Sequence, residues 1–156
     1  MRSRSGLSRV AAVAATVVLL SLAAVAELGG TVSSVQADQQ RLNATRSVRQ
    51  AQTYTVHEMR TPNQGVIHEF VTPAGKVFAV SYRGPILGES NALLGSYANQ
   101  LAPALRTAHT GLHRGGPVHI ELPGLTYHAI GHMRSYIVHA YLPDNIPQGV
   151  TAEELQ

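Results

Sequence analysis

The sequence predicts an α+β domain in which an antiparallel sheet of about six strands packs against one main helix. Two observations support this prediction. Short β-prone runs separated by turn-forming residues come in two groups of three, and a segment with an apolar helical face lies between the groups. A short helix is expected before the first group, which gives the order α-βββ-α-βββ. Consecutive strands joined by tight turns form an antiparallel meander, and helices segregated from runs of strands are typical of the α+β class.

The first expected element is a short helix over residues 35–43, which carry a thin apolar stripe. Ser33 or Ser34 would cap its N-terminus, since a serine hydroxyl can accept a hydrogen bond from a free backbone N–H there. Residues 44–52 are polar and basic. They would either extend this helix or form a linker.

Three strands are expected next, over residues 53–59, 66–71 and 77–82, where aromatic and β-branched residues recur. The segments between them have the composition of turns. Pro73 presets the backbone angle of one turn and Gly75 permits a left-handed residue. These three strands form the first half of the expected sheet.

The main helix is expected from Asn91 to about Ala102, with leucines and a tyrosine four residues apart on one face. Ser90 would cap it, and Pro103 would kink or end it because proline lacks the backbone N–H. Residues 106–117 are rich in histidine and glycine and are expected to form a loop.

Three more strands are expected over residues 118–122, 125–130 and 133–142. They complete the second group. Thr151 and Glu154 then have the spacing of a capping box, which predicts a terminal helical turn.

The first 26 residues have the features of a secretory signal peptide. Arginines without any acid precede an apolar run from Val10 to Ala26, and small residues stand at Ala24 and Ala26. We expect cleavage after Ala26; the alternative is a retained anchor, although about 17 residues is the lower limit for crossing a bilayer. The predicted organisation is a signal peptide at 1–26, a leader and short helix at 27–52, and a single domain at 53–156. The protein is therefore expected to be periplasmic or extracellular, with no stable membrane anchor after cleavage.

Charge and cysteine content narrow the classes of function. The chain has 12 Lys and Arg against 9 Asp and Glu. Three of the arginines precede the apolar run, so the mature part holds nine of each sign. Nucleic acid is not an expected partner, because phosphate binding needs an excess of basic side chains. With no cysteine, the exported domain must be stabilised by its core rather than by disulfides.

Several stretches, taken in order, resemble a family of exported bacterial proteins known as domain of unknown function 2844. The matching segments are residues 28–30, 54–58, 69–75, 77–85, 93–97, 131–134, 140–143 and 149–150. The resemblance implies export in a Gram-negative bacterium. It implies no activity, cofactor or catalytic residue.

Histidine is the most conspicuous ionisable residue type. The eight histidines are His57, His68, His109, His113, His119, His128, His132 and His139. Two pairs have the i, i+4 spacing of helical zinc ligands, but glycines interrupt both, and in a strand such residues lie roughly 13 Å apart. Ligands could converge across strands, for example His57 with His68 or His119 with Glu121. We nevertheless expect no metal and no cofactor. A proton switch is a further possibility, since histidine titrates near pH ~6.5.

No catalytic residue is expected. The segment Gly88-Glu89-Ser90 resembles a nucleophile elbow only loosely, since Ala92 replaces the final glycine. Glu58 and Glu69 lie on consecutive expected strands and could face each other. A chain of about 130 residues can hardly frame the cleft that a glycosidase needs.

The candidate binding residues are His132 and Arg134, which follow Gly131 near a strand start. They could clamp an anionic group, since arginine offers two parallel donors. Alternatively, Gly131 is a bulge and Arg134 pairs with an acid such as Glu58. The expected function is a small exported module without enzymatic activity that binds a small anionic ligand or an envelope protein. The alternatives are an envelope-assembly accessory that pairs through a sheet edge, and a histidine-based metal-binding protein or hydrolase.

Overall fold

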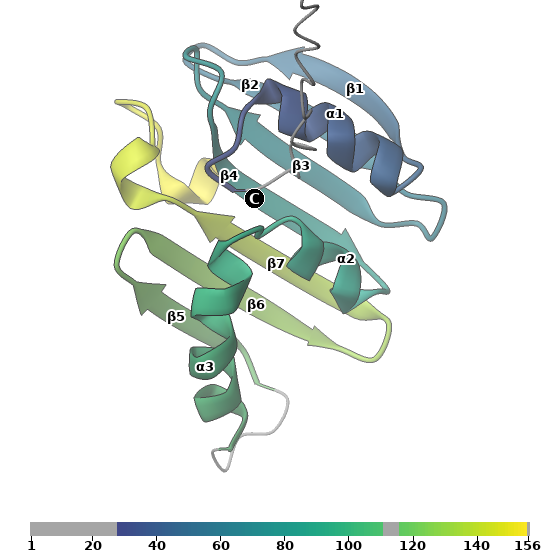
Figure 1. The fold of residues 1–156 in the computed structure, drawn as a ribbon, viewed down its shortest axis with the longest axis vertical. Coiled ribbons are helices and arrows are strands. Elements are labelled where there is room, and N and C mark those ends of the chain that lie inside the picture. Colours follow the sequence, from purple (N-terminus) through teal and green to yellow (C-terminus); the bar gives the residue numbers. More distant parts are fainter. Residues whose placement is uncertain (1–27, 111–115, 156) are drawn as a thin grey trace, which may run out of the picture.

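A computed structural model describes residues 28–110 and 116–155 of the chain. These residues form one seven-stranded antiparallel sheet with three helices on one of its faces (Figure 1). The elements in chain order are α1 (Val32–Arg41), β1 (Thr45–Gln50), β2 (Thr55–Arg60), β3 (Val66–Val71), β4 (Val77–Gly84), α2 (Leu87–Ala92), α3 (Tyr97–Thr110), β5 (Val118–Leu122), β6 (Leu125–His132), β7 (Ser135–Tyr141), and the 3-10 turns η1 (Pro143–Asn145) and η2 (Ala152–Leu155). The α+β class is confirmed.

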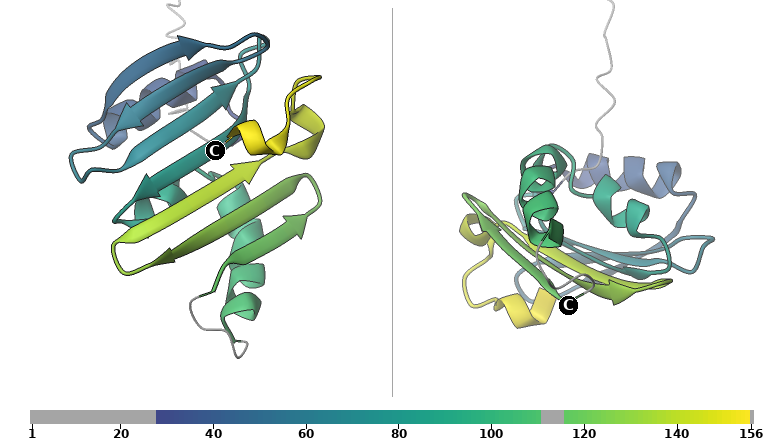
Figure 2. Two further views of the ribbon diagram at one scale, coloured as in Figure 1. Left: turned by 180° about the vertical axis from the view of Figure 1, so that it is seen from behind. Right: turned by 90° about the horizontal axis from the view of Figure 1, so that it is seen from below.

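The strand order is β1-β2-β3-β4-β7-β6-β5. Each half of the chain forms a meander, as expected, and the two meanders join where β4 pairs with β7. The helices α2 and α3 connect the two halves and lie on the same face as α1 (Figure 2). The segment after β7 lies against the opposite face, so the sheet has a helix side and an open side.

The sheet has one more strand than the expected six. Residues 44–52, expected to extend a helix or form a linker, contain β1, which pairs antiparallel with β2. β1 is an edge strand whose side chains are nearly all exposed, so it shows no alternation of apolar and polar residues. Its conformation is set by backbone hydrogen bonds to β2, which no local pattern reveals.

The first helix begins at Val32, earlier than expected, and its N-cap is Thr31 rather than Ser33 or Ser34. The Ser34 hydroxyl instead donates to the backbone carbonyl of Thr31. At the other end of the chain, the Glu154 carboxylate lies 3.4 Å from the backbone nitrogen of Thr151, as the capping-box spacing predicted.

The expected main helix is in fact two helices, α2 and α3. Gly95 separates them with a φ of 53°, a left-handed conformation that glycine adopts at no steric cost. Ser90 is not a cap: it lies inside α2 and its hydroxyl donates to the Leu87 carbonyl, 2.7 Å away. Pro103 does not end α3, which continues to Thr110 through part of the expected loop. The proline ring is on the exposed side of the helix, where it displaces no core packing.

Apolar side chains pack on both faces of the sheet. The larger cluster lies between sheet and helices and includes the fully buried Val35, Met59 and Leu101. The smaller one, on the open side, stacks Tyr54, Phe70 and Phe78 with ring centroids 5.9–6.3 Å apart beneath the C-terminal segment. The open side is therefore covered near β2–β4. None of the helices in the described part of the chain is long and apolar enough to cross a membrane.

Candidate functional site

His132 and Arg134 lie at the tip of the β6–β7 hairpin. β6 ends at His132 and β7 begins at Ser135, so Met133 and Arg134 form a two-residue turn, with Arg134 in the left-handed region at φ 64°. Both candidate residues are exposed. Their role as an anion clamp stays a prediction.

Gly131 is not a bulge, because it pairs with Tyr136 in an unbroken register. Because Gly131 has no side chain, β6 and β7 can lie close together here. A Cβ at this position would lie 2.4 Å from the Ser135 carbonyl oxygen and 2.8 Å from the Tyr136 Cα. This glycine is needed for packing the hairpin.

Glu58 contacts neither of the residues considered as its partners in the sequence, Arg134 and Glu69. Its carboxylate lies 2.7 Å from the Arg60 guanidinium and 3.4 Å from the His68 ring, and β3 and β4 separate its strand from β7. Glu58 is opposite His68 in the register, so it points to the open side, whereas Glu69 points to the helices. The two glutamates therefore do not face each other.

A groove on the helix side is larger than the hollow on the open side that is described below. It lies between α2, α3 and strands β5–β7, and its volume is about 700 Å³. We call it the helix-face groove. Its walls are mainly apolar or aromatic: Leu87, Leu105, Val118, Tyr127, Tyr136 and Val138. Pockets for small molecules are typically apolar clefts of about 300–1,000 Å³ with a few polar groups.

The polar groups in the helix-face groove are mostly positive or neutral. Arg106 from α3 and His132 from β6 line it, with Asn91 from α2, and no carboxylate is among the described lining residues. Burial raises the pKa of Tyr127, which keeps its hydroxyl neutral. The groove thus combines apolar walls with donors suited to an anion.

Two exposed large apolar residues line this groove. They are Leu87 and Ile130. Ile86, directly before Leu87, and Met133, three residues after Ile130, are exposed as well. Ile130 is 51 % exposed and Met133 is 91 % exposed. Single exposed apolar residues are ordinary, but a group at the mouth of a cleft is typical of binding sites.

The open side carries a row of histidines. The row crosses five neighbouring strands, and each residue in it is directly opposite the next in the register. Its members are His68 of β3, Ser81 of β4, His139 of β7, His128 of β6 and His119 of β5. The sequence alone did not reveal this row, because it depends on the β4–β7 pairing between the two halves of the chain.

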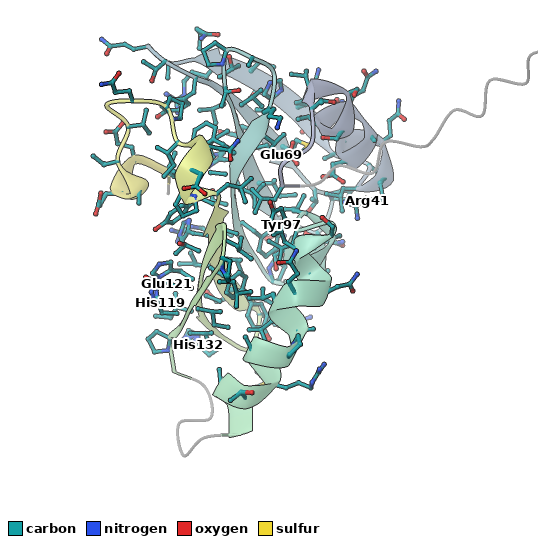
Figure 3. All side chains as sticks on the ribbon, turned by 60° about the vertical axis from the view of Figure 1, so that its left-hand side comes forward. Arg41, Glu69, Tyr97, His119, Glu121 and His132 are labelled. Carbon is teal, nitrogen blue, oxygen red and sulfur yellow. The ribbon has the colours of Figure 1, made fainter. Side chains whose placement is uncertain are left out.

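His119 and Glu121, named above as side chains that could converge on a metal, are in contact. His119 Nε2 lies 3.0 Å from Glu121 Oε1, and His119 Nδ1 lies 2.9 Å from His128 Nε2. Figure 3 shows His119 and Glu121 together, away from the helices. His57 and His68 do not converge, because His57 points to the helix side and His68 to the open side. His113 and the side chain of His109 lie outside the described part of the chain.

A second hollow, of about 550 Å³, lies over this row. We call it the open-face hollow. It is lined by His119, His128 and His139, and η2 closes one side with Ala152 and Glu153. Burial lowers the pKa of His139, a shift opposed by a hydrogen bond to the Leu155 backbone. The Nδ1 atom of His139 is buried without a hydrogen-bond partner.

A third cluster of ionisable groups is closed to solvent. Asp38 of α1 and Glu69 of β3 are 0 % and 2 % exposed, and Arg41 donates to Asp38. Burial, reinforced by the charge of Asp38, raises the pKa of Glu69 to about 9. Glu69 is therefore protonated at neutral pH and can donate to Asp38. Figure 3 shows Glu69 and Arg41 on the side of α1. This pair fastens α1 to the sheet and is no candidate for binding.

Comparison with known proteins gives one match. No curated protein and no solved structure matches the chain. A family model described as a protein of unknown function, DUF2844, matches residues 24–155, which include both hollows and every described strand. The resemblance seen in the sequence is confirmed, and the chain belongs to the DUF2844 family.

Proposed function

We propose that the protein is an exported, non-enzymatic binding module that holds a small anionic amphiphile in the helix-face groove. The observation that carries this proposal is the lining of the groove, in which apolar walls meet Arg106 and His132 and no described carboxylate. An apolar tail would occupy the space between the helices and the sheet. A carboxylate or similar head group would lie beside Arg106 of α3.

The energetics favour such a ligand over a fully polar one. Each methylene group removed from water contributes about 0.8 kcal/mol, so a tail of several carbons can supply most of the affinity. A charge-assisted hydrogen bond adds about 1.5–3 kcal/mol and selects the head group. The tip residue Arg134 follows His132 closely and would add positive charge at the same end.

The features of residues 1–26 support export, and residues 1–27 lie outside the described part of the chain. The absence of cysteine is compatible with an oxidising compartment, because no thiol can be lost to oxidation. We therefore place the module in the periplasm or outside the cell.

The alternative functions have less support. The edge strand β1 carries the cations Arg46 and Arg49, and charged side chains on an edge oppose pairing with another chain. Ser90, whose segment loosely resembles a nucleophile elbow, is buried in α2, and its hydroxyl donates a hydrogen bond to a backbone carbonyl. Covalent catalysis by Ser90 would need a hydroxyl that a substrate can reach.

The proposal is tested by titrating the purified secreted protein with decanoate and with the uncharged decanol in a calorimeter. We expect decanoate to bind with one site and decanol to bind more weakly. Arg106→Gln should weaken decanoate binding roughly tenfold and leave decanol unchanged, because it removes only the partner of the head group.

The matched control is Arg83→Gln, which removes an exposed arginine of β4 on the open side. It should change neither affinity. Absence of decanoate binding, or equal losses in Arg106→Gln and Arg83→Gln, would contradict the proposal.

A further inference from the structure

The geometry points to a metal site on the open side of the sheet, in which His119, His128 and His139 bind one divalent transition-metal ion. Zn²⁺ and Cu²⁺ are the expected ions, since imidazole nitrogen is a favoured ligand of both. This site is separate from the helix-face groove and does not depend on the function proposed for it.

The register of three adjacent strands brings the ligands together. His119 of β5 is directly opposite His128 of β6, and His128 is directly opposite His139 of β7. Opposite residues of antiparallel strands have Cβ atoms about 4.5–5.5 Å apart. Three imidazole rings on one face at this spacing are close enough to share an ion.

Two of the rings already stand at nearly the required separation. His119 Nδ1 lies 2.9 Å from Nε2 and 3.1 Å from Nδ1 of His128, so either nitrogen of His128 is available. Two nitrogens bound to one tetrahedral zinc ion are roughly 3.3 Å apart, given Zn–N bonds of about 2.0 Å. A small separation of the rings would admit the ion between them.

Glu121 prepares His119 for this role. Its carboxylate accepts a hydrogen bond from the His119 Nε2–H at 3.0 Å, which leaves the lone pair on Nδ1, the nitrogen that faces His128. A carboxylate bonded to the far nitrogen of a histidine ligand fixes its tautomer and raises its basicity. Glu121 would therefore act as a positioning residue.

His139 supplies the third nitrogen. A hydrogen bond to the Leu155 backbone engages its ring, while Nδ1 is buried and has no hydrogen-bond partner. As the side chains stand, no three of the described metal-binding side chains surround one point. Binding thus requires a rotation of the His139 ring, after which its unpartnered nitrogen would bind the metal ion.

The open-face hollow leaves room for a fourth ligand. Its volume of about 550 Å³ lies over the three histidines, so water or a small anion can reach the ion. Three protein ligands with one open position are typical of zinc sites that exchange a ligand.

The experiment is calorimetric titration of the tag-free secreted protein with ZnCl₂ and, separately, with CuCl₂. We expect one ion per chain. His119→Ala, His128→Ala and His139→Ala should each weaken binding at least 100-fold, and Glu121→Gln should weaken it about 10–100-fold. Circular dichroism of each variant checks that the sheet is intact.

The matched control is His68→Ala. His68 belongs to the same row and also contacts a carboxylate, Glu58, but its neighbour on β4 is Ser81 rather than a histidine. It should leave the affinity unchanged. Absence of stoichiometric binding, or losses in His68→Ala equal to those in His128→Ala, would overturn the proposal.

The visible spectrum of the Co²⁺-loaded wild-type protein tests the ligand number without any variant. Intense absorption is expected from a four-coordinate ion with three histidines. Weak absorption typical of six-coordinate Co²⁺ would overturn the three-histidine site, even if His139→Ala failed to fold.

Discussion

The pair formed by Asp38 and Glu69 joins a helix to the sheet through one proton. Two buried carboxylates this close could not both be charged without a large cost, and one of them stays protonated. The remaining charge, on Asp38, is balanced by Arg41 of the same helix. Asp38 Oδ2 and Glu69 Oε2 have no other donor, so the proton of Glu69 satisfies both groups.

This arrangement predicts that stability falls as pH rises above neutral. Glu69 ionises near pH 9 when folded but near its ordinary pKa of 4.5 when unfolded, so the unfolded chain releases the proton first. The free energy of unfolding should decrease by up to about 1.4 kcal/mol per pH unit between pH ~7 and ~9. Urea unfolding at several pH values measures this slope, and Glu69→Gln should flatten it.

The pH range of this test lies above that in which His57 affects stability. Burial lowers the pKa of His57, so its contribution to stability is lost only as the pH falls through about 6.5, where the unfolded state takes up a proton. Asp144→Asn, at an exposed carboxylate, should keep the wild-type slope. A wild-type stability that does not change between pH ~7 and ~9 would contradict the protonation of Glu69.

At the scale of elements, the β6–β7 hairpin links both hollows. Its odd and even positions point to opposite sides of the sheet. Tyr127 and Val138 thus line the helix-face groove, while His128 and His139 line the open-face hollow. A change that displaces one strand against the other would disturb both sites.

Gly131→Ala is expected to cause such a displacement. The added methyl group would meet backbone atoms of β7 at 2.4 and 2.8 Å, which cannot move without shifting the strand. We expect a loss of about 1–3 kcal/mol in the free energy of unfolding, measured by urea denaturation.

Gly88→Ala is the control, since a methyl group there has no neighbour within 4 Å and Gly88 lies within α2. It should stabilise the protein by roughly 0.5–1 kcal/mol, because alanine favours the helix over glycine. Equal effects of the two substitutions would show that Gly131 is not required for close packing.

Elements differed in how far their sequences predicted them. Strands β3 and β5 begin and end where expected, because their β-branched residues lie between clear turn signals. β1 was missed because its sequence is polar on both faces. The extent of α3 was missed because a proline inside a helix is locally unfavourable. Packing of buried residues such as Leu101 stabilises the helix despite Pro103.

At the scale of the whole molecule, the sheet separates the two hollows for which we propose different ligands. The helices lie on one side, and the C-terminal segment covers only part of the other (Figure 2). Both hollows are lined by strands of the second meander, β5–β7. An apolar ligand on one side and a metal ion on the other could therefore bind together.

Export is the prediction that belongs to this scale. We expect the protein released from the periplasm or recovered from the medium to begin at Glu27, because the signal peptidase requires small residues at Ala24 and Ala26. N-terminal sequencing or intact-mass measurement tests this. Replacing Ala26 with arginine should leave the precursor uncut and membrane-bound; a precursor mass in the soluble wild-type fraction would contradict the prediction.

The sequence by itself determined the α+β class, the two meanders, the family and the expectation of export. These rest on local patterns: period-two alternation, turn residues, and an apolar run with a basic start. His119 and Glu121, which the sequence offered only as possible metal ligands, lie two residues apart on one strand. Short-range spacing is sufficient for such features.

Only the tertiary structure decided which distant residues meet. The partner of Glu69 is Asp38 of α1 rather than Glu58, and the partners of His128 come from both neighbouring strands. Asp38 meets Glu69 because α1 packs on the sheet. The histidines meet because of the register of β5, β6 and β7, in which a shift by one residue would turn each side chain to the other face.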